Sequence, residues 1–215
     1  MLESLLLGKR LKSGLIVDIN FADADIGSTA IIDKGSLGAR YTRSRYSGTT
    51  GDGVVDVAGK GRAYYFDGNT RFISDITPKL YDKPYRITAA IMAGAKSGTI
   101  AASGAYPSAA GLRSGYALHA GQYPGSYVQH FMADQYGNYT RVLLDGAVPA
   151  NVIDNIIVNR RADGSFTVES TTRGVKNVYP VINFAPVDSY FMVGGTHSDD
   201  NFQGHLFSLK IEILG

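Results

Sequence analysis

Residues 206–214 read Leu-Phe-Ser-Leu-Lys-Ile-Glu-Ile-Leu. Apolar and polar side chains alternate in this stretch from Phe207 to Ile213. Such a period of two predicts a β-strand with one face in a hydrophobic core and the other in water. A strand is likewise predicted at Tyr85–Ala93, where the same period places Tyr85, Ile87, Ala89 and Ile91 on one face.

Other short segments extend this pattern along the chain. Strands are predicted at Gly14–Asn20, Arg62–Phe66, Gly115–His119, Tyr127–Ala133, Tyr139–Leu144, Val152–Asn159, Ser165–Thr171 and Tyr190–Gly194. Asp163-Gly164 separates two apolar runs and is a strong β-hairpin signal. No long segment has a helical period and no fixed-length repeat is visible, so alternating βα folds, propellers and solenoids are not expected.

The composition favours one all-β domain. The chain has 215 residues, of which 26 are Gly and 14 are Tyr, and many turns and aromatic residues are typical of β proteins. The absence of Cys excludes a disulfide framework and thiolate metal sites. A net charge of +2 argues against a dedicated nucleic-acid partner.

Residues 1–13 are predicted to form an N-terminal arm, with a short helix that carries Leu2, Leu5 and Leu6. Burying leucines is worth about 1.5–3 kcal/mol each, so we expect them to dock on a partner protein or on a second copy of the chain. A frayed terminus is the alternative. No standard secretory signal is expected, because Lys9-Arg10 follow the leucines instead of preceding them. No apolar stretch is long enough to span a bilayer.

Several motifs, in order, indicate a family. Ile32-Asp33-Lys34-Gly35 follows the first predicted strand, and residues 61–68 read Gly-Arg-Ala-Tyr-Tyr-Phe-Asp-Gly. Residues 155–168 then read as strand, Asp-Gly, strand, and residues 202–206 read Phe-Gln-Gly-His-Leu. This order resembles laminin-G-like domains, which belong to the concanavalin A-like lectin/glucanase jelly-roll group. The resemblance implies an all-β, two-sheet antiparallel jelly-roll sandwich over residues 14–215. The chain departs from the family pattern in having no Trp.

Catalysis is not predicted. Glycosidases need two carboxyl groups about 5–10 Å apart, and the three Glu residues of this chain have no second carboxylate two or four positions away. The sequence also lacks a Gly-x-Ser-x-Gly elbow, a His-Glu-x-x-His motif and a phosphate-binding loop.

The region 106–139 is the richest in residues that suit recognition. Its candidate binding residues are Tyr106, Tyr116, Tyr123, Tyr127, Tyr136 and Tyr139, together with His119 and Gln129. Tyr rings beside amide side chains suit a glycan site. The same composition also fits a subunit contact, where Tyr is enriched, or plain packing of the sandwich. All three interpretations stay open.

Two charged segments complete the survey. The segment with Asp199 and Asp200 is interpreted as an Asp-rich solvated loop. The alternative, which the family resemblance suggests, is a calcium ion at the rim of the sandwich with Asp199, Asp200 and Asn201 as candidate ligands, together with Asp33. No other cofactor is predicted. The basic stretch Arg40–Tyr46 is interpreted as a solvated strand edge, with an acidic neighbour or a phosphate as the alternative.

These observations lead to three hypotheses on function. The first is a non-catalytic structural and recognition module of an extracellular assembly, specifically a bacteriophage virion or tail component, bound to other assembly proteins or to itself. The second is a free carbohydrate-binding lectin that contacts cell-surface glycans through the Tyr-rich region. The third is a divergent glycosidase. No nucleic acid and no membrane span enter any of them.

Overall fold

The computed structural model describes residues 14–46, 51–80, 83–96, 98–103, 115–121, 127–133, 139–146, 151–178, 190–196 and 201–215. These residues form strands and turns, without a helix among them. The strands are β1 (Gly14–Asn20), β2 (Tyr41–Arg45), β3 (Gly53–Val57), β4 (Gly61–Asp67), β5 (Thr70–Ser74), β6 (Tyr85–Ala93), β7 (Gly98–Ser103), β8 (Gly115–Ala120), β9 (Tyr127–Ala133), β10 (Tyr139–Asp145), β11 (Asp154–Arg160), β12 (Phe166–Ser170), β13 (Gly174–Val178), β14 (Phe191–Val193) and β15 (Gln203–Ile213).

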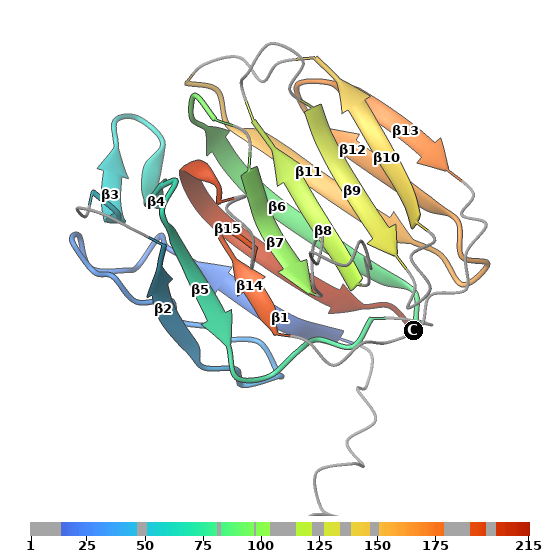
Figure 1. Ribbon diagram of the computed structural model, residues 1–215, viewed down its shortest axis with the longest axis horizontal. Helices are drawn as coiled ribbons and strands as arrows, with labels where there is room; N and C mark the ends of the chain where they lie inside the picture. The colour runs from blue at the N-terminus through green and yellow to red at the C-terminus, as the bar shows by residue number, and fades with distance from the viewer. Residues whose placement is uncertain are drawn as a thin grey trace, which may run out of the picture.

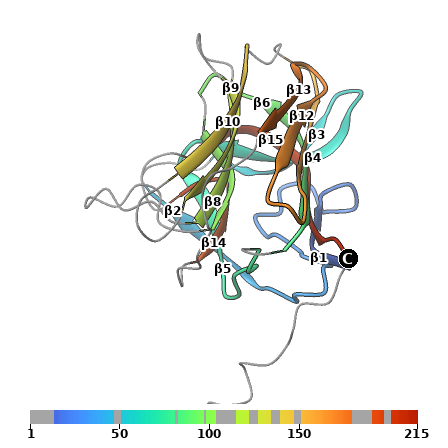
Figure 2. The same cartoon turned by 90° about the vertical axis from the view of Figure 1, so that its right-hand side faces the viewer.

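The strands form two antiparallel sheets that pack face to face (Figures 1 and 2). The back sheet has the order β13-β12-β11-β6-β15-β4-β3, and β1 also pairs with β15. The front sheet has the order β10-β9-β8-β7-β14-β5-β2. The predicted two-sheet jelly-roll sandwich is therefore confirmed.

Strand β15 is the centre of the back sheet. It pairs with β6 along one edge, and along the other edge it pairs first with β4 and then with β1. Leu209, Ile211 and Ile213 are buried as the alternation predicted, but a bulge between Leu206 and Ser208 interrupts the register. Phe207 lies at this bulge, so it leaves the predicted alternation and is only partly buried.

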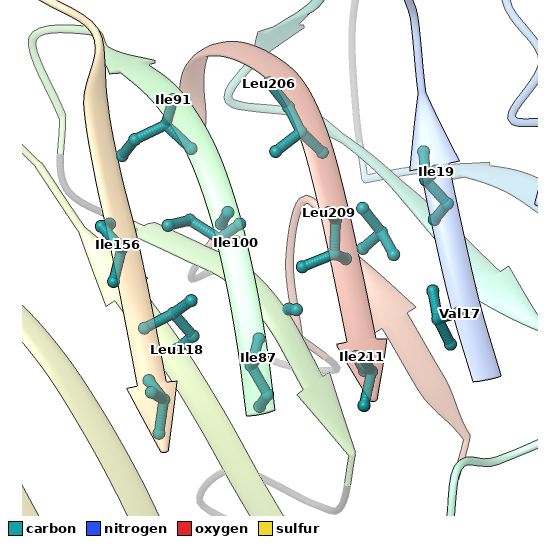
Figure 3. Close-up of a cluster of buried hydrophobic side chains, with 14 of the residues drawn as sticks. Val17, Ile19, Ile87, Ile91, Ile100, Leu118, Ile156, Leu206, Leu209 and Ile211 are labelled. Atoms are coloured by element: carbon teal, nitrogen blue, oxygen red, sulfur yellow. The ribbon is translucent and has the colours of Figure 1, made fainter. Parts of the chain in front are cut away.

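The core lies between the sheets and is built from branched aliphatic side chains (Figure 3). Ile87 and Ile91 of β6 lie on its back wall, and Ile100 of β7 and Leu118 of β8 lie on its front wall. All four are fully buried. At about 1.5–3 kcal/mol for each such side chain, this layer is the main source of stability.

The segment Asp33-Lys34-Gly35 packs closely against β1. The Asp33 Oδ1 atom accepts hydrogen bonds from the backbone N–H groups of Asp18 and Gly35, at 2.7 and 2.8 Å. A Cβ atom at Gly35 would fall 2.3 Å from the Ile16 carbonyl oxygen, so only glycine fits this close approach. The segment therefore holds the chain against the edge of β1.

A buried ion pair ties the two sheets together at one end of the sandwich. The Asp154 carboxylate, at the start of β11, accepts hydrogen bonds from Ser170 Oγ at 2.8 Å and from Arg173 Nη1 at 3.0 Å. Arg173 also donates to the carbonyl oxygens of Gly121 and Gly146, which follow β8 and β10 of the front sheet. Both charged side chains are almost fully buried.

Candidate functional site

The outer face of the front sheet, which points away from the core, carries the side chains with the strongest claim to recognition. Because side chains alternate along a strand, neighbours of core residues point outward. His119 lies between the core residues Leu118 and Ala120, so it points to this outer face. Gln129 does the same on β9, between Val128 and the buried His130.

Five polar residues form a line across this face, which we call the polar row: Arg71, Asn201, Thr99, His119 and Gln129. Thr99 pairs with His119 across β7 and β8, and His119 pairs with Gln129 across β8 and β9. The Thr99 Oγ1 and His119 Nε2 atoms lie 2.7 Å apart. Thr99 also forms an isolated bridge with Asn201.

The close packing around Gly195 shows that Asn201 and Arg71 lie next to each other at the other end of the polar row. A Cβ atom at Gly195 would lie 2.1 Å from Asn201 Oδ1 and 3.1 Å from Arg71 Cβ, so these two side chains border the same point. Arg71 stands on β5 next to the core residue Phe72. From β5 to β9 the row crosses four inter-strand steps, which is about 19 Å at about 4.8 Å per step.

Three atoms of the polar row are buried without a hydrogen-bond partner. They are Arg71 Nε, Asn201 Oδ1 and Gln129 Oε1. The Asn201 and Gln129 side chains are also strongly buried, at 6% and 3% exposed. Leaving such a group unpaired costs about 1–3 kcal/mol, and this cost is relieved when a ligand supplies the missing partner.

An apolar row runs beside the polar row on the same face. Cross-strand pairing joins its members in register, and they are Ile73, Met192, Ala102, Ala117 and Phe131. Ala102, Ala117 and Phe131 form a hydrophobic cluster separate from the main core. Apolar side chains beside a few polar atoms that need partners are the usual lining of a small-molecule or sugar site.

The predicted Tyr-rich region divides in the structure. Tyr116 shares the inward side of β8 with Leu118, is 2% exposed, and has its ring 6.4 Å from that of Tyr85. Its position fits the packing interpretation and places it away from the polar row. Tyr127 lies on β9 and Tyr139 on β10, with side chains outside the described residues. Tyr106, Tyr123 and Tyr136 lie outside the described residues altogether.

His130 lies on β9 with its ring between the two sheets. Its Nε2 atom lies 3.0 Å from Tyr85 Oη, and its ring contacts Phe166 edge to face. Burial in this apolar surrounding lowers the pKa of His130 to about 3. It is therefore a neutral core residue rather than part of the outer face.

The basic stretch 40–46 contains edge strand β2, as predicted, but its arginines are not simply solvated. Arg43 Nε donates to Asp52 Oδ2 at 2.9 Å, and Arg45 Nη2 lies 3.6 Å from Asp52 Oδ1. Burial by itself would raise the pKa of Asp52, but hydrogen bonds from Arg43 and Tyr64 lower it below its usual value. The acidic neighbour is thus supplied by the chain itself.

The calcium and arm predictions are not tested. Asp199 and Asp200 lie outside the described residues, as do Leu2, Leu5 and Leu6. Asp33, the other acidic candidate, already accepts hydrogen bonds from the turn that follows β1. Across the described ranges, no three metal-binding side chains (His, Cys, Asp or Glu) come together.

Sequence reasoning found His119 and Gln129 but missed Arg71 and Thr99. Arg71 lies on β5, a five-residue strand that was not predicted. Asn201 was considered only as a calcium ligand. Its neighbourhood with Arg71 depends on the tight packing of Gly195, which no local sequence pattern reveals.

Comparisons with known proteins support the fold. No family model and no curated protein matches the sequence. Among solved structures, the chain is similar to the binding domain of Paraclostridial Mosquitocidal Protein 1, with a TM-score of 0.64 and 12% identity. That match covers 94% of this chain and 50% of the other, so the chain spans about half the length of the toxin binding domain.

Two further structures belong to proteins whose names refer to carbohydrates. Domain 4 of AbnA, a GH43 extracellular arabinanase from Geobacillus stearothermophilus, in complex with arabinotriose, matches with a TM-score of 0.57 and 15% identity, covering 94% of each chain. The Ruminococcus gnavus IT-sialidase CBM40 bound to alpha2,3 sialyllactose matches with a TM-score of 0.51 and 11% identity, covering 62% of this chain and 78% of that one. These likenesses support the jelly-roll fold; the finer resemblance to laminin-G-like domains stays a prediction.

A search of the described residues for a helix of sufficient length and apolar character to cross a membrane found none.

Proposed function

We propose that this chain is a non-catalytic carbohydrate-binding domain that holds a glycan along the polar row. The observation that carries the proposal is the presence of three buried polar atoms without partners in one line. Two are amide acceptors, which suit sugar hydroxyl donors, and one is a guanidinium donor, which suits a sugar oxygen. Beside these atoms lies the apolar row, of which Met192, Ala102, Ala117 and Phe131 are buried in this structure. An apolar lining of this kind suits the C–H groups of sugar rings.

The structural neighbours support this class of ligand. The arabinanase domain is described in complex with arabinotriose and the sialidase module with sialyllactose. The mosquitocidal-protein neighbour is itself a binding domain. The sequence identities lie between 11% and 15% for these three structures, so the specific sugar must be found from the site of this chain.

The test is a glycan array followed by titration calorimetry on the ligands that bind, with arabinotriose, lactose and 3′-sialyllactose included. Gln129→Leu removes the unpaired Oε1 atom while keeping the volume of the side chain. We expect it to weaken glycan binding at least about tenfold, the loss of about 1.4 kcal/mol of contact energy. Its folding stability should stay the same or rise by about 1 kcal/mol, because a buried orphan acceptor is removed.

Gln203→Leu is the matched control, because Gln203 Oε1 is also buried without a partner but lies on β15 of the back sheet. This variant should bind glycans as the wild-type protein does. The proposal would be contradicted if the wild-type protein bound no glycan on the array, or if the Gln129→Leu variant bound glycans as tightly as the wild-type protein. New reducing ends released from a bound polysaccharide would instead support the glycosidase hypothesis.

A further inference from the structure

Arg71 carries a positive charge in the polar row that no carboxylate of the described residues balances. Arg71 Nη1 donates to the Thr196 carbonyl oxygen, while its Nε atom is buried and has no partner. No carboxylate of the described residues pairs with this guanidinium, although Arg43, Arg86 and Arg173 each pair with one. Arginine keeps its charge at any physiological pH, so this site holds a partly buried cation for which the described residues supply no counter-ion.

Among the described strands of the front sheet, the other charges on the outer face are far from Arg71. The exposed Arg141 and Asp145 both belong to β10, five inter-strand steps from β5. That separation is about 24 Å at about 4.8 Å per step, well beyond the Debye length of about 8 Å at physiological salt. Asp145 therefore does not neutralise Arg71, and the described strands of the front sheet offer no closer carboxylate.

The two ends of the polar row need different partners from a ligand. At one end, Arg71 needs an acceptor, and a carboxylate satisfies both its charge and its free N–H group. At the other end, about 19 Å away, Gln129 Oε1 needs a donor, which a sugar hydroxyl provides. One sugar ring is too short to reach both, whereas an oligosaccharide laid across the strands reaches them together.

We infer that the ligand is an acidic oligosaccharide, with the carboxylate of a sialic or uronic acid unit on Arg71 and the hydroxyl groups of following units on Asn201, His119 and Gln129. This inference rests on the proposed carbohydrate-binding function and adds the class of sugar and its orientation. The cross-strand direction follows from the pairing that aligns Thr99, His119 and Gln129.

The test compares each acidic sugar with a neutral form of the same size. Affinities are measured for 3′-sialyllactose and its methyl ester, and for trigalacturonic acid and its methyl ester. We expect at least one acid to bind about tenfold or more tightly than its ester, as a charge-assisted hydrogen bond predicts. Arg71→Gln should bring that ratio to near one, and Arg71→Lys should give an intermediate ratio.

Arg160→Gln is the matched control, because Arg160 Nε is also buried without a partner but Arg160 stands on β11 of the back sheet. A thermal melt of each variant shows that it is folded before its affinities are compared. If acid and ester bind equally to the wild-type protein while Gln129→Leu weakens both, the inference is wrong and the proposed function stands. If the wild-type protein binds no sugar in either form, both are wrong.

Discussion

At the scale of single residues, His130 shows how the core sets a chemical property. Its imidazole lies between the sheets, next to Tyr85 and Phe166, where a charged form would lose its hydration. The folded protein therefore keeps this ring neutral down to a pKa of about 3, whereas an unfolded histidine takes up a proton near pH 6.5.

This difference predicts acid sensitivity. Below pH 6.5 only the unfolded chain protonates His130, so stability should fall as the pH decreases from about 6.5 towards 3, by at most about 1.4 kcal/mol per pH unit. Urea unfolding at several values between pH 6.5 and 5 measures the slope. We expect His130→Gln to flatten it.

His205→Gln serves as the control for His130, because burial also lowers the pKa of the half-buried His205. The His205→Gln substitution should reduce the pH dependence of folding stability less than the His130→Gln substitution does. An unchanged slope in the His130→Gln protein would show that His130 titrates alike in the folded and unfolded states.

Single residues also show how much of the candidate site the sequence could predict. Composition alone indicated region 106–139, yet Tyr116 proved to be a core residue and His119 an outer one. In β8, which reads Gly-Tyr-Ala-Leu-His-Ala, every residue is buried, so burial does not distinguish its two faces. Only the pairing with β7 and β9 brings Thr99, His119 and Gln129 into one line.

At the scale of elements, strand positions followed closely from the sequence. Gly14–Asn20, Tyr85–Ala93 and Tyr127–Ala133 have the bounds that their patterns predicted. The strands β3, β5, β7 and β13 were missed. Each is only five or six residues long, and β13 is an edge strand with four exposed residues, so it offers little hydrophobic pattern to detect.

The Asp154–Arg173 pair makes an element-scale prediction, because it joins β11 to the ends of β8 and β10. Asp154→Ala leaves the Arg173 charge buried without its partner, and we expect a loss of about 3–5 kcal/mol of folding stability. Chemical denaturation gives the value.

The double variant Asp154→Leu/Arg173→Met should recover part of that loss, since apolar side chains can replace a buried ion pair. A loss below about 1 kcal/mol in the Asp154→Ala protein would mean that the ion pair and the hydrogen bonds from Ser170 and Thr172 contribute little to stability.

At the scale of the whole molecule, the oligomeric state and the role of residues 1–13 stay predictions. Three leucines within seven residues favour burial by about 1.5–3 kcal/mol each. We expect light scattering to give an oligomer for the full chain and a monomer for residues 14–215. If both proteins are monomers, self-assembly through the arm is excluded. The main sequence-based argument for a virion or tail component is then lost.

The position of β15 has a consequence for how the protein is made. This strand, residues 203–213, separates β6 from β1 and β4 in the back sheet, yet a ribosome synthesises it last of the described strands. Until it emerges, the inner edges of β1, β4 and β6 lack their partner, and unpaired edges invite aggregation. Closure of the back sheet therefore waits until β15 has been synthesised, and the nascent chain depends on slow, long-range pairing.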